Sequence, residues 1–211
     1  MPGTQTTNRW KTTGLALVIF VVCTIGGHAS GSDSRSRHSA PPISSEVGSR
    51  DSEYRIKALF LYRIVRWVTW PTANLKKNST KITIGIVGKD PFGKELDLLT
   101  KLKPINKRKI VIKRFENVGD IKKTQVLFVS RSLSDDEVKE VIAIAQKDHV
   151  LLVGEKTGFI DDGGTLGFLI KSNRVKFEVN MIAAKSSKLK ISSQILKMAI
   201  RILQEKKKKK K

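Results

Sequence analysis

The chain is almost without cysteine, since Cys23 is the only one among its 211 residues. Cys23 lies in an apolar segment near the N-terminus that we interpret as an export signal, so we expect the processed chain to contain none. A chain without cysteine forms no disulfide and has no thiol nucleophile or thiolate metal ligand. An exported domain of this kind must be stabilised by its hydrophobic core.

Residues typical of catalytic sites are also scarce. Only His38 and His149 follow the expected signal, and neither belongs to an H-x-x-H or H-E pattern. Asp161 and Asp162 are adjacent in an Asp-Gly turn. Adjacent carboxylates point apart, so the pair is not expected to bind one cation. No G-x-S-x-G nucleophile motif is present. We therefore predict a binding or regulatory protein that is not an enzyme and uses no cofactor or metal.

Acidic residues are outnumbered, and the 41 Lys and Arg against 19 Asp and Glu give a net charge of +22. Such a charge would favour nucleic acid as a partner in a cytosolic protein. Here Arg9 and Lys11 precede the apolar run 15–25, which is too short to span a bilayer comfortably. We expect export to the periplasm with cleavage after Ala29, an uncleaved anchor being the alternative, and no nucleic-acid partner.

The tails differ from the central sequence in composition. The segment after the signal is rich in Ser, Gly, Arg and Pro, and the chain ends in Lys206–Lys211. That tail and the segment Lys101–Lys113 either provide solubility or hold the protein near anionic lipid or polysaccharide. We expect a signal peptide (1–29), a disordered linker (30–52), an α/β domain (53–204) and a lysine-rich tail (205–211).

The central sequence alternates short apolar strands with amphipathic helices, which is typical of an α/β domain. Strands without polar residues in their centres favour a parallel sheet buried on both faces. Two final strands joined by a short turn make the sheet mixed. We predict a three-layer αβα sandwich with a mixed, largely parallel sheet, followed by a C-terminal β-hairpin plus helix. The expected strands are Lys81–Val87, Ile110–Phe115, Val126–Ser130, Val150–Val153, Thr165–Ile170 and Arg174–Val179.

Helical periodicity marks the beginning and the end of the domain. A helix from Glu53 towards Pro71 is expected to bury one apolar face. The alternative is that Tyr62, Trp67 and Trp70 form an exposed aromatic edge for a partner. The residues of the expected buried face are Ile56, Leu59, Phe60, Ile64, Trp67 and Val68. A last helix, beginning at Ser192 and Ser193, is expected to bury Ile195, Leu196, Ala199, Ile202 and Leu203.

The segment Gly88–Lys94 has the G-x-x-x-x-G-K spacing of a phosphate-binding loop. It lacks the Ser or Thr that holds magnesium, because Glu95 stands at that position. Asp90 would repel phosphate and Pro91 removes a backbone donor. The sequence thus favours a tight strand-to-helix turn over a nucleotide site.

Six motifs follow one another along the domain. They are K-A-x-F-L-Y (57–62) with W-P (70–71), G-x-D-P-F-G (88–93), V-L-F-x-S (126–130), G-F (158–159) with G-G (163–164), N-R-V-x-F-E-x-N (173–180), and A-A (183–184) with S-S-x-x-L (192–196). In these motifs the chain resembles the YfiR family of periplasmic regulators, and the resemblance covers about Glu53 to Ile202.

The resemblance implies a non-enzymatic domain that binds the periplasmic part of a membrane-bound signalling enzyme and holds it inactive. In the best-known member the enzyme is a diguanylate cyclase, whose release raises cyclic di-GMP and favours biofilm growth. Other members are sensory domains, so a sensor kinase is an alternative partner, and a homodimer is left open. The family often has a cysteine before its Q-V-L-F segment, where this chain has Thr124, which excludes a redox switch here.

Candidate residues for contact with the partner come from the most specific motifs. They are Tyr62, Trp67, Asn173, Arg174 and Glu178, and packing or capping within the domain is the competing interpretation. A second hypothesis is a small-molecule sensor, whose pocket would lie at the ends of the parallel strands. The residues expected at this pocket are Asp90, Pro91, Phe92 and Gly93.

Overall fold

A computed structural model describes residues 45–205, with side chains from Arg50 onward. The expected signal peptide, most of the expected linker and Lys206–Lys211 lie outside the described residues. Within residues 45–205, no helix is both long and apolar enough to cross a membrane. No three His, Cys, Asp or Glu side chains in the same part of the chain gather as a metal site requires.

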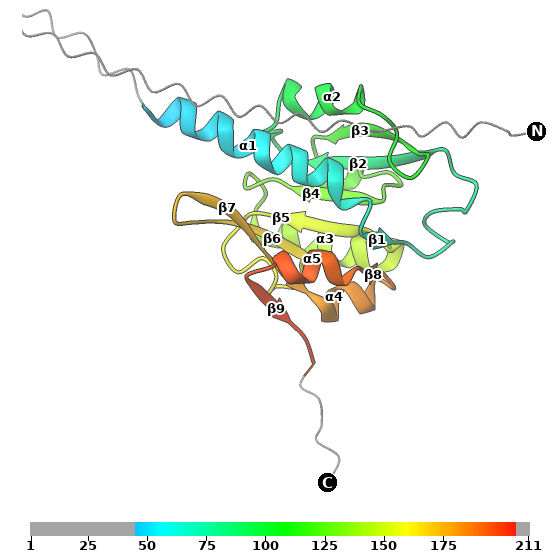
Figure 1. Ribbon diagram of the computed structural model, residues 1–211. Helices are drawn as coiled ribbons and strands as arrows, with labels where there is room; N and C mark the ends of the chain where they lie inside the picture. Colours follow the sequence, from blue (N-terminus) through cyan, green and yellow to red (C-terminus); the bar gives the residue numbers. More distant parts are fainter. Residues whose placement is uncertain (1–44, 206–211) are drawn as a thin grey trace, which may run out of the picture. The chain divides into compact units, whose positions relative to one another are not determined.

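A seven-stranded mixed sheet forms the centre of the domain, in the order β3-β2-β4-β5-β6-β7-β9 (Figure 1). The first five strands in that order are parallel, whereas β7 and β9 run in the opposite direction. A separate two-stranded ladder joins β1 (Val68–Thr69) and β8 (Lys190–Ile191). The sheet strands are β2 (Lys81–Val87), β3 (Lys109–Phe115), β4 (Val126–Val129), β5 (Leu151–Gly154), β6 (Leu166–Lys171), β7 (Arg174–Asn180) and β9 (Arg201–Leu203).

Helices cover both faces of the sheet and bury two separate apolar clusters. On one face, Ile84 of β2 packs with Leu61 and Leu96 from two helices. On the other, Leu127 of β4 packs with Val141. The first face carries α1 (Ser45–Ile64), α2 (Lys94–Thr100), α4 (Met181–Ser186) and α5 (Ser193–Met198), and the second carries α3 (Asp135–Asp148) and the short helix η1 (Val118–Asp120). The predicted αβα sandwich is thus confirmed.

Local sequence explains why α3 begins and ends where it does. Ser134 caps the helix, accepting a hydrogen bond from the Glu137 backbone N–H, while the Glu137 side chain accepts one from the Ser134 backbone N–H. At the other end, His149 adopts a left-handed conformation, with φ 58°, that stops the helix. Helix α3 thus begins at a capping box, and His149 is a turn residue.

The first helix differs from the expectation at both ends and in its buried face. It begins at Ser45, inside the segment expected to be disordered, and ends at Ile64 because Val68 and Thr69 pair with β8. Ile56 is 53% exposed, whereas Lys57, Ala58 and Leu61 are fully buried. Apolar residues are spread almost evenly around α1, so helical periodicity could not select the face.

The last helix is shorter than predicted. It begins as expected behind Ser192, whose side chain accepts a hydrogen bond from Gln194, but it ends at Met198. The following residues form β9, and Ile202, expected on a buried helical face, is 38% exposed on this edge strand. Pairing with the free side of β7 replaces the last helical turn.

Candidate functional site

The carboxyl edge of the sheet, where the parallel strands β2–β6 end, carries the strongest candidate site. Open α/β sheets bind their ligands at this edge. Here β5 stops at Gly154, which pairs with Gly167, while β6 continues to Lys171. Ser172 and Asn173, with φ 51° and 56°, form the left-handed turn into β7. The β6–β7 hairpin therefore projects beyond its neighbour (Figure 1).

A buried ionic cluster lies at the base of this hairpin; we call it the Lys57 cluster. The Lys57 side chain is completely buried and forms ion pairs with Glu155, which follows β5, and with Glu53. The Tyr54 hydroxyl donates to Glu155 Oε1 at 3.0 Å. Arg131, which follows β4, places its Nε 3.3 Å from the same oxygen. The cluster thus fixes the first half of α1 to the ends of β4 and β5.

The energetics of this cluster depend on complete pairing. An ammonium and a carboxylate lose much of their hydration when buried, and their attraction repays that loss only when both remain paired. The pKa of the Tyr54 hydroxyl is raised to about 12, first by burial and then by the negative charge of Glu155. Both effects favour the neutral phenol that donates to the carboxylate.

A cavity of about 680 Å³ lies beside the Lys57 cluster, and we call it the hairpin cavity. Its walls include Arg131, Glu155, the side of β6 that β5 leaves uncovered, and Arg201. Arg201 forms ion pairs with Asp161 and, at 3.4 Å, with Glu178. The guanidinium lowers the pKa of the Asp161 carboxyl chiefly through their hydrogen bond. The cavity therefore presents charges of both signs beside apolar wall.

The loop along the floor of the cavity is held by one aromatic side chain. Phe159 is buried and inserts between two glycines, and a Cβ at Gly154 would lie 2.6 Å from its ring. A Cβ at Gly164 would lie 2.2 Å from the same ring. Only glycine allows this approach at positions 154 and 164, whereas Gly158 and Gly163 adopt positive φ, 78° and 113°, which also favours glycine.

The structure separates the five predicted contact residues into two groups. Tyr62 is only 8% exposed and its hydroxyl donates to the Lys103 carbonyl at 2.7 Å. Trp70 is also buried, its indole nitrogen donating to the Gln125 carbonyl, and Trp67 is half-buried against the core. The exposed aromatic edge considered from the sequence is therefore wrong. These side chains stabilise the C-terminal end of α1.

The other three predicted residues belong to the hairpin. Asn173 and Arg174 are exposed at its tip, and Glu178 lies on β7 at the wall of the hairpin cavity. They lie far from Tyr62 because α1 crosses the sheet from one edge to the other. Tyr54 of α1 contacts Glu155 at the carboxyl edge, and Tyr62 contacts Lys103 at the opposite edge. The five residues do not form one surface.

The alternative pocket residues belong to a closed turn. Phe92 is buried against Phe128, and Asp90 accepts hydrogen bonds from the Phe92 backbone and from Arg114. Gly93 precedes α2 with φ 52°. Pro91 is partly buried within the turn. None of the residues Asp90–Gly93 lines the hairpin cavity.

Four residues of the candidate site were not selected from the sequence: Lys57, Arg131, Glu155 and Arg201. A usable signal existed for Lys57, which opens the K-A-x-F-L-Y motif and precedes Ala58 and Leu61, both of which turn out to be buried. A lysine inside an apolar helical segment requires a carboxylate partner. The partner, Glu155, is 98 residues away, and no local pattern identifies it.

Comparisons with known proteins identify a family and distant solved structures. The YfiR/HmsC-like family model matches residues 54–200. No curated protein matches the chain. A conserved domain protein from Vibrio cholerae has 12% identity and a TM-score of 0.47, over 71% of this chain and 60% of that one. The ABC domain from Streptococcus pneumonia, in complex with L-Trp, has 11% identity and a TM-score of 0.45, over 69% and 62%. The chain thus spans less than two thirds of either solved structure. Since the family model covers most of its length, the chain belongs to the YfiR/HmsC-like family.

Proposed function

We propose that the chain is an exported regulatory protein that binds the periplasmic domain of a membrane signalling enzyme of the diguanylate cyclase type and represses it. The observation that carries this proposal is membership of the YfiR/HmsC-like family across residues 54–200. This family is regulatory and periplasmic. The identity of the enzyme and the repression itself are parts of the proposal.

The β6–β7 hairpin is the best-supported contact surface for such a partner. Arg174 is exposed at the tip, and Ile170, 45% exposed, adds apolar area beside the hairpin cavity. On its β5 side, β6 pairs through Leu166 and Gly167 only, so Phe168–Lys171 has no strand neighbour there among the described residues. An uncovered strand edge can pair with an extended segment of another protein.

Repression would follow from selective binding. A membrane enzyme can exchange between an active and an inactive arrangement. A bound protein shifts this equilibrium only by the difference between its affinities for the two arrangements. A protein that moves the population from one per cent to ninety-nine per cent inactive must bind that arrangement about 10⁴-fold more tightly. The Lys57 cluster supports this by fixing α1 to the ends of β4 and β5, of which β5 is the neighbour of β6.

Crosslinking in intact cells, followed by affinity purification and mass spectrometry, tests the proposal. We expect recovery of a membrane protein with a cytoplasmic cyclase or kinase domain. The double variant Ile170→Asp with Arg174→Glu should abolish that recovery and raise cellular cyclic di-GMP. Both side chains are exposed, so the fold should tolerate the changes.

Lys94→Glu provides a matched control. It reverses an exposed charge at the start of α2. This helix follows β2, which lies near one end of the strand order, whereas the hairpin strands β6 and β7 lie near the other. The control should leave recovery and cyclic di-GMP unchanged. Purification that yields no membrane signalling protein would refute the proposal, and equal loss in both variants would refute the role of the hairpin.

A second candidate function is small-molecule sensing, favoured by the hairpin cavity rather than by Asp90–Gly93. Its volume of about 680 Å³ lies in the range of ligand pockets. Arg131 and Arg201 would favour a ligand with an anionic group. Thermal stabilisation by a metabolite, lost in Arg131→Met, would support this function.

A further inference from the structure

Charge is distributed unevenly between the two edges of the sheet. At the amino edge, where the parallel strands begin, the segments carry 16 Lys and Arg but one acidic residue, Asp148. After the carboxyl ends of β2–β5, the segments carry 4 basic and 11 acidic residues. The amino-edge segments are 63–81, 101–109, 121–125, 147–150 and 185–190, and the carboxyl-edge segments are 88–97, 115–120, 130–137 and 155–162.

Three neighbouring hollows occupy the amino edge. One, of about 480 Å³, includes Lys77, Arg108 and Lys190 in its wall and no acidic residue. A second, of about 460 Å³, adds Lys103 beside exposed Leu102 and likewise has no acidic lining. The first shares wall residues with each of the others, so the three are continuous.

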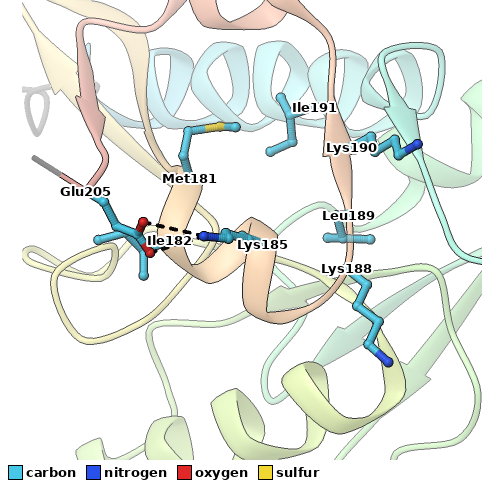
Figure 2. Close-up of a pocket in the computed structure, with 8 residues that line it drawn as sticks. All are labelled: Met181, Ile182, Lys185, Lys188, Leu189, Lys190, Ile191 and Glu205. Carbon is cyan, nitrogen blue, oxygen red and sulfur yellow. Dashed lines mark hydrogen bonds and ion pairs between the residues drawn. The ribbon is translucent and has the colours of Figure 1, made fainter. Parts of the chain in front are cut away.

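The third hollow, of about 600 Å³, lies between α4 and β8 (Figure 2). Its apolar wall includes Ile182, which is 38% exposed, and Leu189. Lys185 is partly neutralised by Glu205 at 3.4 Å. Lys188 and Lys190 extend from the rim, and no acidic side chain of residues 50–205 lies within ion-pair distance of either.

The end of the described chain also lies at this edge. Strand β9 runs in the direction opposite to β2–β6, so it leads towards the amino edge. Glu205, two residues beyond β9, lines the third hollow.

We infer that the amino edge docks on an anionic membrane surface. Lysines attract anionic headgroups, and exposed Leu102 and Ile182 supply apolar side chains that can enter the headgroup boundary. A second copy of this chain that met it amino edge to amino edge would present the same positive charge and be repelled. Single-stranded nucleic acid requires exposed aromatic platforms, whereas Tyr62 and Trp70 are buried here.

Vesicle flotation tests the inference on the exported form of the chain, with its N-terminus read by mass spectrometry. Vesicles of phosphatidylglycerol with phosphatidylethanolamine are compared with vesicles of phosphatidylcholine. We expect binding only to the anionic vesicles, with release as salt is raised. The triple variant Lys77→Glu, Lys103→Glu and Lys190→Glu should bind about 100-fold more weakly.

The matched control reverses the same number of charges near the carboxyl edge, through Lys89→Glu, Lys94→Glu and Lys171→Glu. All six lysines are exposed, and circular dichroism confirms that both variants fold. We expect the control to bind within about threefold of the natural chain, because its charges lie beyond a Debye length from the lipid. Equal weakening in both variants would show that net charge alone acts, and this would overturn the inference.

Further outcomes would also overturn it: undiminished binding of the amino-edge variant, equal binding to phosphatidylcholine, or capture of an acidic protein without any vesicle binding. The inference is independent of the proposed function. Vesicle binding does not involve Ile170 or Arg174, so the hairpin variant should float like the natural chain. Failure of partner capture and failure of membrane binding are therefore separable.

Discussion

Lys57 occupies a core position on α1 that a hydrophobic residue ordinarily fills. Its charge is matched by Glu53 and Glu155, and Tyr54 and Arg131 both contact the other oxygen of Glu155, Oε1. A well-packed apolar replacement of a buried pair is often no less stable than the pair itself. We therefore interpret the cluster as the interaction that fixes the position of α1 on the sheet. The apolar periodicity of α1 does not determine which face of the helix is buried.

Glu155→Gln tests the pairing. It removes the more deeply buried of the two carboxylates from Lys57 and should lower the free energy of unfolding by about 3–5 kcal/mol. Chemical denaturation measures the loss. Glu95→Gln, which breaks the exposed pair with Arg55, should cost about 1 kcal/mol or less. The double variant Lys57→Met, Glu155→Gln should recover most of the stability, and a double variant as unstable as Glu155→Gln would contradict this account.

Tyr54 gives the cluster a signature at alkaline pH. Because folding raises its pKa from 10.0 to about 12, the folded state retains a proton that the unfolded state loses. The stabilisation is complete below pH 10 and is lost as pH rises to about 12. Denaturation across this range should show a steeper loss in the natural chain than in Tyr54→Phe. Parallel curves would mean that the hydroxyl is not coupled to folding.

At the scale of whole elements, sequence patterns located nearly every strand of the main sheet. Strand β2 was predicted at its observed bounds, and both strands of the hairpin were predicted to within one residue of theirs. The exception is β9, because three edge residues carry no periodicity that distinguishes a strand from a last helical turn. Its position depends on the free edge of β7, which is a property of the tertiary fold.

The candidate site was less predictable than the fold. Asn173, Arg174 and Glu178 come from one contiguous motif, and the structure keeps them on one hairpin. Glu155 follows β5, Arg131 follows β4, and Lys57 lies on α1. These residues are distant in the sequence, and only the strand order brings them together. Tyr62 was selected for aromaticity, but aromatic rings fill cores as readily as interfaces.

The loop that forms the cavity floor should be sensitive to a single methyl group. In Gly154→Ala, the new Cβ would meet the Phe159 ring at 2.6 Å, and we expect a loss of about 1–3 kcal/mol in unfolding free energy. Gly119→Ala is the matched control, because nothing lies within 4 Å of its Cβ position. Amide hydrogen exchange should accelerate in residues 155–162 of Gly154→Ala alone. Unchanged exchange would mean that Phe159 does not hold the loop.

For the whole molecule, the two proposed surfaces lie at opposite ends of the sheet strands. The hairpin extends from the carboxyl edge (Figure 1). The basic hollows lie where β2 and β3 begin. A domain that rests on lipid through its amino edge would direct the hairpin away from the membrane. The contact with a partner would then be made with the part of its periplasmic domain that stands above the bilayer.

This orientation can be measured because Cys23 is the only cysteine in the chain. In a Cys23→Ser background, Leu102→Cys at the amino edge and Ser172→Cys at the hairpin tip each provide one labelling site, and both positions are exposed. With a fluorophore on each, we expect quencher-bearing anionic vesicles to quench the probe at 102 and to leave the probe at 172 bright. Salt that releases the protein should restore the first signal, since the attraction is electrostatic. Quenching of both probes alike would mean that the domain has no fixed orientation, and quenching at 172 alone would place the hairpin, rather than the lysine-lined hollows, against the lipid.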